Sequence, residues 1–69
     1  MHHINIEDKI EIITDRISAI ENYTNEINQE LAMGLIAEDQ IESINGILSN
    51  NQIVLIKLNE LLTNLNKML

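Results

Sequence analysis

The sequence contains no cysteine and no proline, only two glycines and a single aromatic residue, Tyr23. Without cysteine the chain can form neither a disulfide framework nor a thiolate metal site. The scarcity of aromatic and turn-forming residues argues against a β-fold and against a stacking platform for nucleic-acid bases. Basic residues are also few, and the formal net charge of −7 argues against binding a phosphate backbone. We therefore expect no nucleic-acid partner.

Long apolar runs are absent as well. No segment approaches the run of about 20 apolar residues that spans a bilayer, and the opening MHHINIEDK lacks the apolar core of a signal peptide. We therefore expect no membrane contact, no signal-peptide secretion, and a location in the cytoplasm. Residues 1–69 make one small domain, and a chain of this length buries too little apolar surface to offset its conformational entropy. With disulfides and thiolate metal sites excluded, oligomerisation is the remaining source of stability.

The apolar residues that are present follow a heptad repeat. In the first half of the chain they alternate at spacings of three and four, and only the threonine at position 24 departs from the pattern. This first seam consists of Ile6, Ile10, Ile13, Ile17, Ile20, Ile27 and Leu31. Asn5 is a natural N-cap, and Gly34 can adopt the left-handed conformation that ends a helix, after which Leu35 can fold back against the last turn. The pattern predicts a helix over residues 6–33.

A second seam follows a turn predicted over residues 34–37. It consists of Ile41, Ile44, Leu48, Leu55, Leu58, Leu62, Leu65 and Leu69, with Asn51 as the one polar position. Ala37 is a poor capping residue, but acidic residues follow it in the first turn. Gly46 and the run Ser49–Asn51 are weak helix formers and could mark a break. Because the heptad phase continues through them, we predict one helix over residues 38–68 that is locally soft there.

The short link between two long helices predicts an all-α antiparallel two-helix hairpin, similar to a coiled coil and completed by oligomerisation into a helical bundle. In the register where opposed residue numbers sum to 75, the two exceptional residues, Thr24 and Asn51, face each other. Our hypothesis is that they form one buried polar layer, hydrogen-bonded to each other, that sets the register at some cost in stability. The alternative is that Asn51 marks a frayed or bent turn.

Apolar residues outside the seams gather on one side of the predicted hairpin, which we name the partner face. It consists of Ile12, Ala19, Tyr23 and Met33 on the first helix and of Ile47, Val54, Leu61 and Met68 on the second. Fully burying four large side chains would contribute about 6–12 kcal/mol, comparable to the stability of a whole domain. We expect a protein partner there, most simply another copy of the chain, since isoleucine at both core positions favours assemblies of three or four helices. Alternatively, the stems of Lys9, Arg16 and Glu30, with the ring of Tyr23, shield this face without a partner.

The opposite flank of the second helix carries an amide column, Asn45, Gln52, Asn59 and Asn66. Amides can donate and accept hydrogen bonds across an interface without burying charge, so this column is either an ordinary polar flank or a second contact surface.

Residues suited to catalysis do not form a recognisable set. His2 and His3 are adjacent and lack the spacing and carboxylate neighbours of a preformed metal site. No nucleophile with a base, no glycine-rich phosphate loop and no aromatic-lined pocket can be assembled from this sequence. We expect no enzymatic activity, no cofactor and no metal site.

The opening INIEDKIEIITDRISAIE, with the isoleucine- and asparagine-rich hairpin pattern that follows, resembles small uncharacterised helical proteins of tailed bacteriophages with AT-rich, often marine, hosts. The resemblance implies a component of a virion or of its assembly and transfers no functional residue. Together these observations favour a non-enzymatic structural or assembly protein. The runner-up is a small acidic regulator that binds and inhibits a host protein. A helical subunit of a chaperone or secretion complex is a third possibility.

Overall fold

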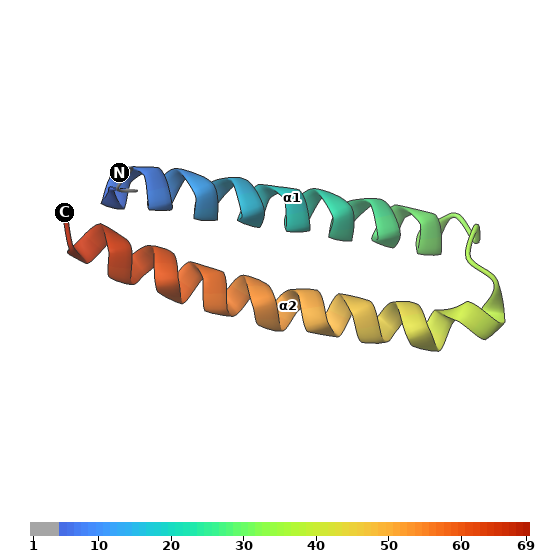
Figure 1. The fold of residues 1–69 in the computed structure, drawn as a ribbon. Helices are drawn as coiled ribbons and strands as arrows, with labels where there is room; N and C mark the ends of the chain where they lie inside the picture. The colour runs from blue at the N-terminus through green and yellow to red at the C-terminus, as the bar shows by residue number, and fades with distance from the viewer. Residues whose placement is uncertain (1–4) are drawn as a thin grey trace.

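The computed structural model describes residues 5–69 and consists, over that range, of two α-helices joined by a short link. α1 comprises Ile6–Ala32 and α2 comprises Glu38–Lys67. Figure 1 shows them side by side and antiparallel, with the start of α1 and the end of α2 at one end of the rod and the link at the other. The Cα radius of gyration is 15.8 Å, whereas a globular chain of this length would have about 11 Å. The predicted all-α hairpin is confirmed.

The two helices begin differently, as their capping residues predict. Asn5 has an extended backbone, and its Oδ1 accepts a hydrogen bond of 2.7 Å from the N–H of Asp8. Ala37 makes no side-chain hydrogen bond to α2. Acidic residues occupy the first turn of both helices, where the helix dipole favours negative charge. Asn5 as the N-cap of α1 is therefore confirmed.

Gly34 terminates α1 in the left-handed conformation, with φ of 70°. Its N–H donates to the carbonyl of Leu31 at 3.2 Å, and the N–H of Leu35 donates to the carbonyl of Glu30 at 3.0 Å. This pair of bonds is the Schellman motif, which satisfies carbonyls at the helix end that have no partner within the helix.

The ends and the link differ in detail from the prediction. Each helix ends one residue earlier than predicted, at Ala32 and at Lys67, because the following methionine caps it. The side chain of Leu35 does not fold back on the last turn of α1, since it is 67% exposed. The next residue, Ile36, is half-buried instead.

α2 continues without interruption through Gly46 and the run Ser49–Asn51. The prediction of one helix is confirmed, and the alternative of a break there is wrong. Apolar contact with α1 on both sides of this stretch holds weak helix formers in the helix, because tertiary packing commonly outweighs intrinsic propensity.

The two seams form the contact between the helices. Every seam position from Ile6 to Leu65 is buried or half-buried, including both polar ones. Leu69 is 70% exposed because it lies beyond the end of α2. The main core cluster contains Ile13, Ile17 and Leu65, packed against Ile6, Ile10, Leu55, Leu58 and Leu62. Packing is therefore densest in the half of the rod away from the link. In the other half, Ile27 is the only buried residue among those that the structure describes.

The hollows between the helices agree with the predicted register. Ile6 and Leu69, whose numbers sum to 75, line one hollow. Thr24 lines another hollow with Leu48, Gln52 and Leu55, whose numbers lie on both sides of 51, the position that the register places opposite Thr24. The hairpin therefore aligns its polar seam positions at nearly the same level of the rod.

Candidate partner-binding face

The partner face is exposed along both helices, as the heptad pattern predicts. Each of its residues is exposed, and among the large ones the most covered are Ile47 at 38%, Val54 at 42% and Leu61 at 43%. Tyr23 is 50% exposed. An apolar surface shared between two elements of one small protein is the usual mark of a contact site for another molecule.

A hollow of about 280 Å³ joins this face to the core. It is lined by Ile12 and Leu61 of the partner face, by Ile13 and Leu65 of the core, and by Lys9. The hollow thus spans both helices at the well-packed end of the rod. An apolar side chain entering it would contact four apolar residues of the hairpin at once.

Charged stems cover this face only in part. Lys9 lines the hollow together with Ile12 and Leu61, so its aliphatic stem borders this face. Leu61 nevertheless keeps 43% of its surface exposed, and the ring of Tyr23 keeps half of its own. Shielding by the chain's own side chains therefore leaves a large part of the apolar surface in contact with solvent.

The charges at the α1 edge of this face are segregated by sign. Lys9 and Arg16 lie in the first half of α1, whereas Glu26 and Glu30 lie in the second half. All four side chains are exposed. They occupy the same two heptad positions, c and g, as the apolar residues that α1 contributes to the partner face. The edge is therefore positive at one end of the rod and negative toward the link.

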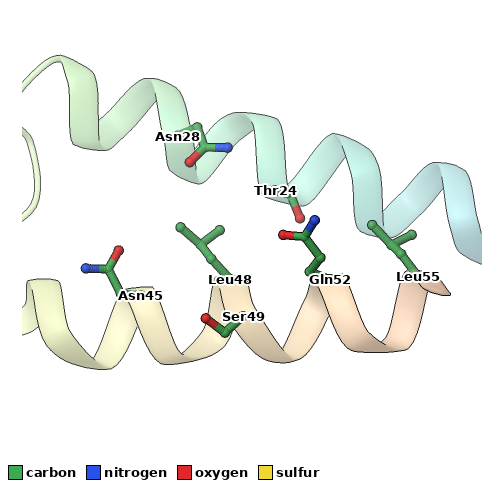
Figure 2. A pocket seen from close by; sticks show the side chains of 7 residues that line it. All are labelled: Thr24, Asn28, Asn45, Leu48, Ser49, Gln52 and Leu55. Carbon is green, nitrogen blue, oxygen red and sulfur yellow. The ribbon is translucent and has the colours of Figure 1, made fainter. Parts of the chain in front are cut away.

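The polar layer differs from our hypothesis. Thr24 and Asn51 are both half-buried in the seam, but neither the Oγ1 of Thr24 nor the Nδ2 of Asn51 has a hydrogen-bond partner. The predicted hydrogen bond between them is therefore wrong. Figure 2 shows the short Thr24 side chain pointing toward α2, between Leu48 and Leu55 and near Gln52.

An amide-lined hollow of about 480 Å³ lies on this side of the layer. Figure 2 shows Thr24 and Asn28 pointing toward α2, and Leu48, Gln52 and Leu55 reaching toward α1. Asn45 and Ser49 complete its lining. Short polar side chains do not fill the space that isoleucine or leucine fills elsewhere in the seam, so the hairpin is loosely packed here. Two members of the amide column thus belong to a surface hollow.

Asn59, a third member of the amide column, turns back onto its own helix. Its Nδ2 donates to the carbonyl of Leu55 at 2.9 Å, and its carbonyl accepts a hydrogen bond from the Oγ1 of Thr63 at 2.9 Å. Both bonds are exposed and span one helical turn. At this position the amide column behaves as an ordinary polar flank.

Two exposed apolar residues of α2 were not singled out from the sequence. Ile53 is 52% exposed and Ile56 is 55% exposed, and both lie on the back of α2, away from α1. Together with Val54 and Leu55 they make the turn 53–56 apolar on every side of the helix. The run of four apolar residues was the available signal, because a helix that is apolar all round is typical of a buried element.

Other kinds of site find little support in the described part of the chain. His2 and His3 lie outside the described residues. Within residues 5–69 no three acidic or metal-binding side chains come close enough together to hold a metal ion. Neither α1 nor α2 has the length and apolar character that a membrane crossing requires.

Comparisons of the chain with models of protein families, with curated proteins and with solved structures found no match. The class of protein that the fold and the partner face define is thus a short antiparallel helical hairpin with an exposed apolar face.

Proposed function

We propose that this protein is a non-enzymatic structural or assembly protein that packs through its partner face into a homo-oligomer or a larger particle, such as a phage virion. The observation that carries the proposal is the exposed apolar surface that runs along both helices, with Ile12 and Leu61 meeting at one hollow.

The small core of the hairpin supports this proposal. Among the described residues only Ile13, Ile17, Ile27 and Leu65 are buried. A chain of fewer than about 70–80 residues usually needs disulfides, a metal or association to supplement a core of this size. This chain has no cysteine. Association through the partner face is the supplement that its exposed side chains favour.

The energy of covering the partner face is of the right size for association. Fully burying a large aliphatic side chain contributes about 1.5–3 kcal/mol, so covering the remaining two fifths of Val54 or Leu61 contributes about 1 kcal/mol each. Two chains that cover this whole face on each other would together gain on the order of 10 kcal/mol. The loss of translational and rotational freedom costs about 4–15 kcal/mol. Stable association therefore requires most of the face to be covered.

Light scattering across a concentration series tests the proposal. We expect a mass of at least twice 7.9 kDa at micromolar concentration. Leu61→Asp and Val54→Asp should each raise the dissociation constant by about a hundredfold or more, because they remove apolar contact and bury an unpaired charge in every copy. Ile56→Asp is the matched control, since Ile56 is 55% exposed on the back of α2. A folded 7.9 kDa monomer at all concentrations would refute the proposal.

A second candidate is an acidic regulator that occupies a basic groove of a host protein. The acidic side chains of α1 favour it, because all of them are exposed and three occupy heptad positions b and f, which face away from α2 and the partner face. They include Glu11 and Asp15. Replacing these two by arginine should abolish binding to such a host protein and leave the mass of the oligomer unchanged. Unchanged binding to the host protein after the replacement of Glu11 and Asp15 would exclude this candidate.

A further inference from the structure

The charged edge of α1 is self-complementary. Arg16 lies five residues before position 21 and Glu26 lies five residues after it. Lys9 and Glu30 repeat the same signs farther out. If a second copy of α1 lies antiparallel to the first, the basic half of each helix faces the acidic half of the other. A parallel arrangement would instead oppose like charges along the whole edge.

The sizes of the neighbouring side chains are also arranged symmetrically about position 21. Ala19 and Tyr23, both exposed on this edge, lie two residues to either side of position 21. In an antiparallel pair centred there, the small side chain of Ala19 faces the ring of the partner's Tyr23. The small residue leaves room for the large one.

The column on α2 points to the same axis. Val54 lies midway between Ile47 and Leu61, which are themselves partly exposed on this face. Position 54 of α2 lies opposite position 21 of α1, because opposed residues in the hairpin have numbers summing to about 75. One axis through the rod therefore passes midway between Arg16 and Glu26 on α1 and through Val54 on α2.

We propose that the partner face binds a second copy of the chain around a two-fold axis that crosses the rod at positions 21 and 54. In this dimer α1 packs antiparallel on α1 of the second copy, and α2 packs antiparallel on α2. Val54 contacts the partner's Val54, Ile47 contacts the partner's Leu61, and Arg16 pairs with the partner's Glu26. This arrangement rests on the proposed function, because it requires that the partner face binds another copy.

Two other symmetric arrangements fit the charges less well. A shift of half a heptad, with Val54 against the partner's Leu61, brings Arg16 near the partner's Arg16, where like charges repel. An axis along the rod places α1 on α2 of the second copy. Lys9 and Arg16 would then lie against an apolar column with no anionic partner, which is costly for a charge removed from water.

Disulfide crosslinking tests the position of the axis directly, because the chain has no cysteine of its own. A two-fold axis brings a residue next to its own copy only where the axis crosses the chain. Val54→Cys should therefore form a covalent dimer under mild oxidation. In Leu61→Cys the two thiols lie on residues fourteen positions apart along an antiparallel pair, about 21 Å, which is beyond the reach of a disulfide. A mixture of Ile47→Cys and Leu61→Cys chains should crosslink, whereas neither chain alone should.

Charge reversal supplies a second test that leaves the apolar contacts intact. Arg16→Glu should raise the dissociation constant about tenfold, because two exposed ion pairs per dimer become repulsive. Lys67→Glu is the matched control, since it changes the net charge equally at the far end of α2. The double variant Arg16→Glu with Glu26→Arg should restore the affinity. No restoration would count against the proposed pairing.

The outcomes separate this arrangement from the function on which it rests. If the wild-type chain is monomeric at all concentrations, the proposed function fails and the arrangement fails with it. If the chain associates and Val54→Cys keeps the wild-type mass but does not crosslink, association stands and the two-fold axis at position 54 is overturned. If a mixture of Val54→Cys and Leu61→Cys chains crosslinks in preference to Val54→Cys chains alone, the half-heptad shift is indicated and the axis at position 54 is overturned. Crosslinking of Val54→Cys alone, with rescue by the double charge reversal, would support the arrangement.

Discussion

Removing the polar layer should stabilise the hairpin. Thr24 and Asn51 are the only polar residues in the seams, and each contains a buried polar atom without a hydrogen-bond partner. Thr24→Val replaces the hydroxyl by a methyl group of similar size. Asn51→Leu introduces leucine, the residue type at the neighbouring seam positions of α2. Both changes remove an unsatisfied group and add apolar contact across the interface between α1 and α2.

The size of the effect follows from the burial of these groups. A buried polar group without a partner costs about 1–3 kcal/mol. Both residues are half-buried, so the lower end of that range applies, and we expect each substitution to raise the free energy of unfolding by about 1 kcal/mol. For a domain of 60–100 residues this corresponds to an increase of about 4–8 °C in Tm per substitution.

Thermal unfolding followed by circular dichroism measures this effect. The protein concentration must be equal for all variants, because association stabilises the folded state by mass action. Thr63→Val is the matched control: its hydroxyl is exposed and donates to the carbonyl of Asn59, so removing it should change the stability by less than about 0.5 kcal/mol. A decrease in Tm for Thr24→Val or Asn51→Leu would show that these polar groups make stabilising interactions and would refute the reasoning.

The remaining predictions concern the helix ends and the glycines. Gly34→Ala should destabilise the hairpin by about 1–2 kcal/mol, because φ at this position is +70° and a Cβ there is strained even though nothing lies within 4 Å of it. Gly46→Ala should stabilise by about 0.5–1 kcal/mol, because Gly46 is inside α2 and its Cβ would also be unobstructed. Urea unfolding of the two glycine variants measures both changes in the free energy of unfolding. Changes of the same sign would contradict the assigned backbone conformations. Asn5→Ala should cost about 0.5–2 kcal/mol through loss of the 2.7 Å bond to Asp8, whereas Asn5→Asp should retain most of the stability.

The inward-facing residues could be predicted because they depend on periodicity alone. Apolar side chains spaced at three and four positions fall on one side of any α-helix, whatever the helix packs against. The seam positions from Ile6 to Leu65 are accordingly buried or half-buried. The same argument predicted that Ile47, Val54 and Leu61 would remain exposed on one flank of a two-helix hairpin.

The orientation and hydrogen bonding of individual side chains at the polar layer could not be predicted in this way. The register brought Thr24 and Asn51 to the same level of the rod, but periodicity does not specify the direction of a short side chain within the seam. In the structure Thr24 points toward the side that carries Gln52, and a hollow forms where short polar residues leave space unfilled. A hydrogen bond depends on atomic positions within a few tenths of an ångström, and these follow from packing.

The two helices, the capping of α1 by Asn5 and Gly34, and the residues that face inward followed from the sequence, because each of these depends on near neighbours in the chain. The tertiary structure alone decided that packing is densest away from the link, that the polar layer is unpaired, and that Ile12 and Leu61 meet at one hollow. These features require two helices to be placed against each other in space, and their physical origin is the fit between side chains far apart in the sequence.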